Sequence, residues 1–213
     1  DLARGEYDFA INYPDGNTET FAYRIDRRRE GSRERVGFGS SDVVYLLMPD
    51  RFANGDRKND SSPLTAEKGN RKLPGGRHGG DLQGIMDHLD YLADLGITAI
   101  WPTPITLDNE PTYSYHGYAC ADYYQIDPRY GSNELYRSLV AAAHEKGIKF
   151  IQDIVPNHSG TAHWWFNDLP FQDWIHQHPT FTRSNYAMSG HSDPHAARTD
   201  LDACVTGWFD TSM

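Results

Sequence analysis

Polar side chains that could do chemistry stand at the end of an apolar run in the last third of the chain. Asp153, Asn157 and His158 close the run 149–155. A carboxylate, an amide and an imidazole together can hydrogen-bond a polar ligand and can stabilise developing charge. Such groups at the end of a strand face the ligand side of a parallel α/β fold. An isolated Asn-His pair would more often be an ordinary loop cap, so the interpretation depends on neighbouring clusters.

Two further polar clusters follow apolar runs in the same sense. The first cluster is 50–60, completed by Gly79-Gly80-Asp81, and it follows the run 43–48. The second cluster is 115–132, which includes His116 and Tyr118, and it follows the run 98–102. The carboxyl ends of parallel strands meet at one edge of a sheet. The sequence therefore predicts that the three clusters form one functional rim.

The first of these clusters has the composition of a cation site. It contains closely spaced Asn, Asp and Gly residues between 54 and 60, and Asp81 follows. Carboxylate and amide oxygens suit Ca²⁺, which takes about six to eight oxygen ligands and tolerates irregular loops. A metal that prefers sulfur or imidazole would not select this set. The alternative is a plain Asn/Asp/Gly turn.

Strands and helices alternate through the middle of the chain and would position these clusters. The first expected helix ends at Gly96 and turns one face inward, made of Ile85, Leu89, Leu92 and Leu95. The second begins after the cap Ser132, ends at Gly147 and turns Leu135, Leu139 and Ala143 inward. Three successive βα units predict a parallel sheet. The periodicity does not separate an open sheet from a closed barrel.

The two ends of the chain follow different patterns, which predict three regions. Apolar residues alternate with polar ones on either side of 14–17, as in a β hairpin. A single hairpin is marginally stable, so we expect residues 1–40 to be the end of a larger β domain and a linker. Residues 41–158 hold the βα units, and the irregular stretch 159–213 forms a third region.

Composition excludes several classes of partner. The chain has 213 residues and a formal net charge of −10, which disfavours nucleic acid and anionic membranes. It has no apolar run long enough to span a bilayer, and the residues that follow Asp1 do not form a charged-then-apolar segment. Aromatic residues make up 13% of the chain, which suits stacking on sugar rings. Cys120 and Cys204 form no disulfide framework and leave the compartment open.

From about residue 41 onward, these motifs resemble the α-amylase superfamily of glycoside hydrolases, and the segment 50–60 resembles its neopullulanase and cyclomaltodextrinase branch. The resemblance implies the first three βα units of a (β/α)8 TIM barrel, with a small inserted domain after the third strand, which would be 159–213. It also implies retaining hydrolysis of α-1,4-glucosidic bonds in starch-derived oligosaccharides, cyclomaltodextrins or pullulan. We expect a periplasmic or extracellular enzyme that forms a homodimer in its full-length form.

The resemblance also assigns roles to residues. His116 would donate a hydrogen bond to the sugar at the scissile bond, Tyr118 would stack beneath that sugar and His158 would bind it, while Asp153 and Asn157 would support the cleft. A structural calcium ion would be held by the following residues: Asn54, Asp56, Asn59, Asp60, Gly79 and Asp81.

The two carboxyl groups that retaining glycosidases need are missing from these motifs. In the family they lie on later strands, so we expect the nucleophile and the acid/base beyond Met213 and an inactive 213-residue chain. One alternative is a non-catalytic member of the fold that binds glucan or a protein. A nucleotide-binding enzyme is disfavoured, because no phosphate-binding glycine motif follows any strand.

Overall fold

The computed structural model describes residues 3–171 and 174, and the chain divides into two compact units, Asp1–Phe38 and Gly39–Met213. In the first unit, β1 (Gly5–Asn12) pairs antiparallel with β2 (Thr18–Ile25), which confirms the hairpin. Phe9 faces Phe21 across the pair, with ring centroids 5.8 Å apart. Both rings remain over 40% exposed, because the hairpin pairs its strands without a second layer to bury them within this unit.

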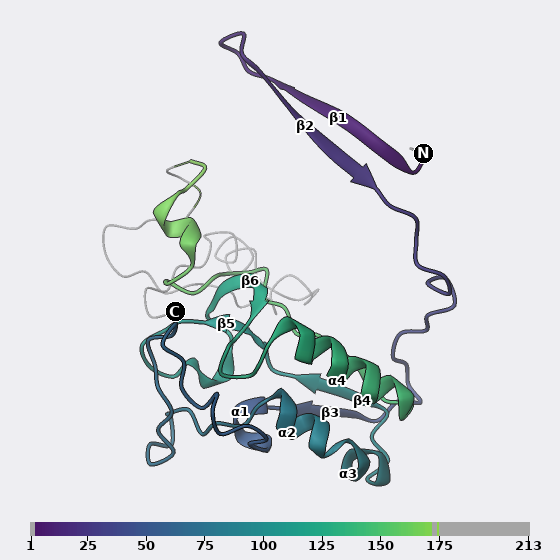
Figure 1. Ribbon diagram of the computed structural model, residues 1–213, viewed down its shortest axis with the longest axis vertical. Coiled ribbons are helices and arrows are strands. Elements are labelled where there is room, and N and C mark those ends of the chain that lie inside the picture. Colours follow the sequence, from purple (N-terminus) through teal and green to yellow (C-terminus); the bar gives the residue numbers. More distant parts are fainter. Residues whose placement is uncertain (1–2, 172–173, 175–213) are drawn as a thin grey trace, which may run out of the picture. The chain divides into compact units, whose positions relative to one another are not determined.

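The second unit is built on a parallel sheet, as the sequence predicts. Its strands are β3 (Val44–Leu47), β4 (Ala99–Pro102) and β7 (Lys149–Phe150), in the order β3-β4-β7. In the described part of the chain this sheet is open, with β3 and β7 at its edges. Figure 1 shows β3 and β4 side by side.

The third strand is much shorter than the predicted run 149–155. Ile151 still donates to the carbonyl oxygen of Ile100 at 2.9 Å, but the chain then leaves the sheet. Pro102 ends the neighbouring strand and has no N–H to continue the ladder. Ile154 is 61% exposed, so the prediction that the run is a buried strand is wrong beyond Ile151.

The helix predicted over 85–95 is two short helices. The helices α2 (Leu82–Asp87) and α3 (Leu89–Asp94) meet at His88, whose backbone leaves helical geometry and whose Nδ1 lies 2.7 Å from the Gly84 carbonyl oxygen. This break ends the single apolar face, so Leu95 is 53% exposed and its predicted inward position is wrong.

The helix predicted after Ser132 is confirmed. It is α4 (Asn133–Glu145), capped by the Ser132 hydroxyl, which accepts from the Leu135 N–H at 3.1 Å. Leu139 and Ala143 are buried, and α4 packs against α2 and β7. The chain turns away at Gly147, with φ +72°.

Several elements that the sequence did not predict shape the loops above the sheet. They are α1 (Pro49–Phe52), the antiparallel pair β5 (Thr106–Asp108) and β6 (Cys120–Ile126), and the 3-10 turns Ser114–His116 and Trp164–Asn167. The inserted domain predicted for 159–213 falls mostly outside the described residues, as does Cys204. None of the helices in the described part is long and apolar enough to cross a membrane.

Candidate sugar-binding site

The structure brings His116, Tyr118, Asp153 and His158 together, and Tyr118 is the centre of the group. Its backbone N–H donates to Nδ1 of His116 at 2.9 Å, and the two rings lie 5.9 Å apart. Its carbonyl oxygen lies 3.0 Å from Nε2 of His158. Its hydroxyl donates to Oδ2 of Asp153 at 3.1 Å. Three residues that are 2, 35 and 40 positions away from Tyr118 therefore contact it at three different atoms.

Asp153 accepts a second hydrogen bond that no pattern in the sequence predicts. The indole N–H of Trp101, at the end of β4, donates to the same Oδ2 at 3.0 Å. The carboxylate therefore ties the end of β4 to the Tyr118 loop. The sequence marks Trp101 only as part of the apolar run 98–102, although the residue is 38% exposed at the rim.

The imidazoles of His116 and His158 are held in their neutral form. Burial lowers the pKa of both rings. Because Nδ1 of His116 accepts from Tyr118, its proton stands on Nε2, which can donate to a ligand hydroxyl. Burial, together with Asp153, raises the pKa of the Tyr118 phenol, so this hydroxyl stays protonated as a donor.

His158 and Asn157 serve the protein framework in this structure. The amide of Asn157 lies 3.2 Å from Nδ1 of His158, whose other nitrogen faces Tyr118. The Tyr123 hydroxyl lies 2.9 and 2.8 Å from the carbonyl oxygens of Val155 and His158, and so holds this segment against β6. A sugar hydroxyl that bonds His158 would have to replace one of these contacts.

Buried polar groups fix the turn that carries His116. The N–H and hydroxyl of Ser114 both donate to Oε2 of Glu67 at 2.7 Å, and Arg77 donates to the Ser114 carbonyl oxygen at 3.0 Å. The Tyr130 hydroxyl donates to the Tyr115 carbonyl oxygen at 2.8 Å. Sequence reasoning missed this network, whose partners are tens of residues apart.

Gly117 permits the sharp return of the chain between His116 and Tyr118. Its φ is +79°, and a Cβ at this position would lie 1.9 Å from the carbonyl oxygen of Pro104. A side chain would therefore be strained in its backbone and would also clash. The short spacing between the imidazole and the phenol thus depends on this glycine.

The residues predicted to bind calcium lie in one loop, where two oxygens are unsatisfied. Oδ1 of Asn54 and Oδ1 of Asn59 are buried without a hydrogen-bond partner. Such orphaned oxygens are costly unless a cation or water satisfies them. The Asn54 amide donates to Oδ1 of Asp60 at 2.6 Å, and a Cβ on Gly79 would lie 2.6 Å from that same Oδ1. This hard-oxygen surrounding fits Ca²⁺.

Asp81 is chiefly a helix cap in this loop. Its two carboxylate oxygens accept from the N–H groups of Gly84, Gly55 and Asp56 at 2.7–3.0 Å, and from the Asn59 amide at 3.1 Å. Within the described residues, no group of three or more His, Cys, Asp or Glu side chains is placed to hold a metal. The calcium ligand set stays a prediction that rests on the asparagine oxygens.

A buried acid lies beneath the rim. Asp108 is fully buried, and its oxygens accept from the N–H groups of Glu110 at 3.1 Å and Ala119 at 3.2 Å. Burial raises its pKa to about 7. Its own N–H donates to Asp127, which Arg129 holds by paired hydrogen bonds at 2.9 and 2.7 Å. This cluster anchors β5 and β6 next to the group around Tyr118.

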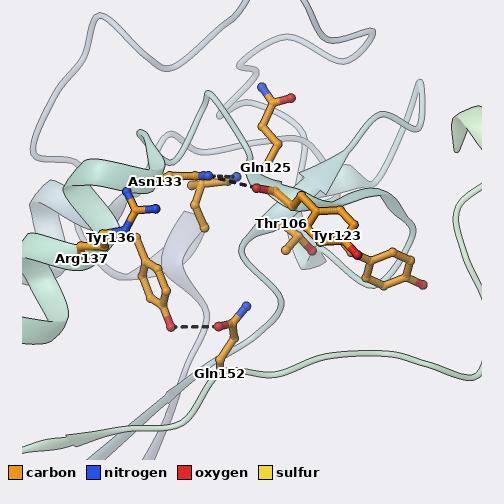
Figure 2. Close-up of a pocket in the computed structure, with 9 residues that line it drawn as sticks. Thr106, Tyr123, Gln125, Asn133, Tyr136, Arg137 and Gln152 are labelled. Carbon is orange, nitrogen blue, oxygen red and sulfur yellow. Dashed lines mark hydrogen bonds between the residues drawn. The ribbon is translucent and has the colours of Figure 1, made fainter. Parts of the chain in front are cut away.

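A cavity of about 230 Å³, lined mostly by residues with polar groups, opens beside α4 (Figure 2). The Tyr136 hydroxyl donates to Gln152 across it at 3.2 Å, and the Asn133 amide bonds the chain at Tyr124 and Ile126. None of the predicted site residues lines this cavity. It is therefore separate from the group around Tyr118.

Comparison with known proteins decides the family. The model of the α-amylase catalytic domain matches residues 46–198, most of the chain. The chain belongs to the α-amylase family. Among curated α-amylase relatives, it is 44% identical over 147 residues to a cyclomaltodextrinase of Geobacillus thermopakistaniensis (63% of this chain, 23% of the relative). It is 42% identical over 156 residues to the intracellular maltogenic amylase of Bacillus subtilis (68% and 26%).

Solved structures agree with this assignment. An Anoxybacillus α-amylase aligns with a TM-score of 0.56 and 41% identity over 64% of this chain and 28% of that one. The α-amylase of Geobacillus thermoleovorans, solved with acarbose, aligns with a TM-score of 0.56 and 34% identity over 79% and 32%. The chain thus spans about a quarter of the length of the curated relatives described above.

Proposed function

We propose that this chain forms the first three βα units of the (β/α)8 barrel of a retaining glycoside hydrolase. Its substrates would be α-1,4-linked glucans: starch-derived oligosaccharides, cyclomaltodextrins or pullulan. The observation that supports this most is the convergence of His116, Asp153 and His158 on the three polar atoms of Tyr118. Relatives named cyclomaltodextrinase, maltogenic amylase and neopullulanase support the substrate class.

The arrangement suits recognition of one glucosyl unit. Nε2–H of neutral His116 is a donor for a sugar hydroxyl, and the half-buried Tyr118 ring offers an apolar face for the C–H face of the sugar. Asp153 has a second carboxylate oxygen that can accept from a hydroxyl group. Hydrogen bonds that strengthen as the sugar ring flattens would lower the barrier to glycosyl transfer.

The nucleophile and the acid/base are proposed to come from later barrel strands of a longer protein. Retaining hydrolysis needs two carboxyl groups about 5–5.5 Å apart on either side of the scissile bond. In the described part of the chain, Asp153 is the carboxylate that contacts Tyr118, and its Oδ2 is occupied by two donors. We therefore assign Asp153 a supporting role rather than nucleophilic attack.

A calcium ion is proposed to stabilise the 54–81 loop. Asn54 and Asn59 would supply the amide oxygens that are unsatisfied in the structure, with Asp60, Asp56, Asp81 and the Gly79 carbonyl as the remaining candidates. The ion would supply positive charge that holds the loop together, and it would not take part in bond cleavage.

Reducing-sugar release from maltotriose and cyclomaltodextrin tests the proposed activity. The 213-residue chain, shown to be folded by circular dichroism, should release no reducing sugar. A longer protein with the complete barrel should release reducing sugar from both substrates. Release by the 213-residue chain would refute the proposal that the nucleophile and the acid/base come from later strands of a longer protein. A folded longer protein that binds maltotriose without cutting it would favour the non-catalytic alternative.

A further inference from the structure

Trp101 is the residue at the rim that the proposed function does not explain. Its ring is 38% exposed, so it does not belong to the buried core, and its indole N–H donates to Oδ2 of Asp153 at 3.0 Å. A hydrogen bond to an ionised carboxylate is stronger than one between neutral groups. Trp101 therefore restrains a charged group at the rim.

The orientation of Asp153 affects the sugar platform directly. The Tyr118 hydroxyl donates to the same Oδ2 at 3.1 Å, so the position of that oxygen fixes the outer end of the Tyr118 ring. The inner end is fixed through the contacts of its backbone with His116 and His158. Without the indole N–H, Oδ2 loses one of its two donors and the carboxylate can rotate about its side-chain bonds.

We propose that Trp101 is a positioning residue for the sugar site, acting through Asp153. Its N–H holds Oδ2 against the Tyr118 hydroxyl, which sets the Tyr118 ring for stacking and leaves Oδ1 of Asp153 directed to a hydroxyl of the sugar. Within the described residues, Oδ1 has no hydrogen-bond donor of its own. This inference rests on the proposed function for the identity of the ligand. The hydrogen bonds that join Trp101, Asp153 and Tyr118 do not depend on that function.

Indole N–H signals in ¹H–¹⁵N NMR spectra of the 213-residue chain test the trio independently of activity. The chain has five tryptophans, and Trp101→Phe identifies the signal of Trp101. Asp153→Ala should move this signal upfield, because the charged acceptor is gone. Tyr118→Phe should move it downfield, because the indole would no longer share Oδ2. A Trp101 signal whose chemical shift is unchanged by both substitutions would overturn the proposal.

Kinetics of the longer protein test the consequence. Trp101→Phe keeps an aromatic ring and removes only the N–H, and should lower kcat/KM on maltotriose about tenfold, the size expected for one hydrogen bond to a charged group. The matched control is Trp164→Phe, whose ring is 53% exposed and which should stay within about twofold of wild type. Equal kcat/KM for Trp101→Phe and wild type would overturn the positioning role.

Failure of the proposed function would be distinguishable from failure of this inference. An inactive longer protein would refute hydrolysis but would leave the NMR result standing. The affinity of the 213-residue chain for maltotriose would then decide the positioning role: Trp101→Phe should weaken it relative to Trp164→Phe, and equal affinities would refute it.

Discussion

Neutralising Asp108 should change how the stability of the chain depends on pH. Burial raises the pKa of Asp108 to about 7 from an ordinary value of 3.8. The folded state therefore holds this proton more tightly than the unfolded chain does. Its contribution is fully present below about pH 3.8, and it is lost as pH rises toward 7. Asp108→Asn mimics the protonated acid and should remove this loss.

The size of the effect follows from the interval between the two pKa values. At ~1.4 kcal/mol per pH unit, an interval of about three units corresponds to roughly 4 kcal/mol as an upper value. Because the Asn amide can accept from only one of the Glu110 and Ala119 N–H groups, Asp108→Asn should start about 1 kcal/mol less stable at low pH. Because the wild type loses ~1.4 kcal/mol per pH unit above about pH 3.8, Asp108→Asn should become the more stable protein above about pH 5 and should lead by up to about 3 kcal/mol at pH 7.

Urea unfolding followed by circular dichroism at several pH values between 4.5 and 8 measures the difference between the two proteins. The difference is needed because burial lowers the pKa values of His116, His158 and His163, which makes stability rise with pH over the neighbouring range. Asp94→Asn, at an exposed position, is the control and should give a constant difference. A difference for Asp108→Asn that stays constant within about 0.5 kcal/mol would refute the buried-acid reasoning.

Three further substitutions or treatments test the loop and the core. Calcium should raise the melting temperature of the wild type, a chelator should reverse this gain, and Asn59→Ala should show no gain. Equal melting temperatures of the wild type with calcium and with chelator would contradict the site. Gly79→Ala should lower the free energy of unfolding by about 2 kcal/mol or more, because φ is +88° and the new Cβ meets Asp60. Gly147→Ala, at φ +72° in open space, should lower it by only about 1 kcal/mol, and equal losses would contradict the clash. Leu139→Ala should lower the free energy of unfolding, measured in urea, by about 2–5 kcal/mol, because Leu139 is buried. Leu95→Ala, at a half-exposed position, should change it by no more than about 0.5 kcal/mol, and similar losses would contradict the packing of α4.

The predictions that succeeded rest on local signals. The order of apolar runs gave the three parallel strands, and Ser132 with Gly147 marked the ends of α4, because caps and left-handed glycines act within one turn. The roles of His116, Tyr118 and His158 come from the resemblance to the α-amylase family and stay predictions. The structure adds that they meet at Tyr118.

The features that the sequence did not reveal depend on distant partners. Trp101 and Asp153 are 52 positions apart, and a tryptophan in an apolar run has no local sign that its N–H will face a carboxylate. The break at His88 arises where a ring nitrogen meets the Gly84 carbonyl oxygen, which periodicity of leucines does not reveal. The early end of the third strand could have been anticipated from Pro102, which lacks the N–H for the next bond.

Maltotriose binding by the 213-residue chain tests most directly whether the residues around Tyr118 form a glucan site. Isothermal titration calorimetry of the wild type should show binding that His116→Ala weakens at least tenfold, because a neutral donor to the sugar is lost. His144→Ala, on the exposed side of α4, should bind like the wild type. A folded chain that binds no maltotriose, or binds it equally well without the His116 imidazole, would contradict the assignment of the site.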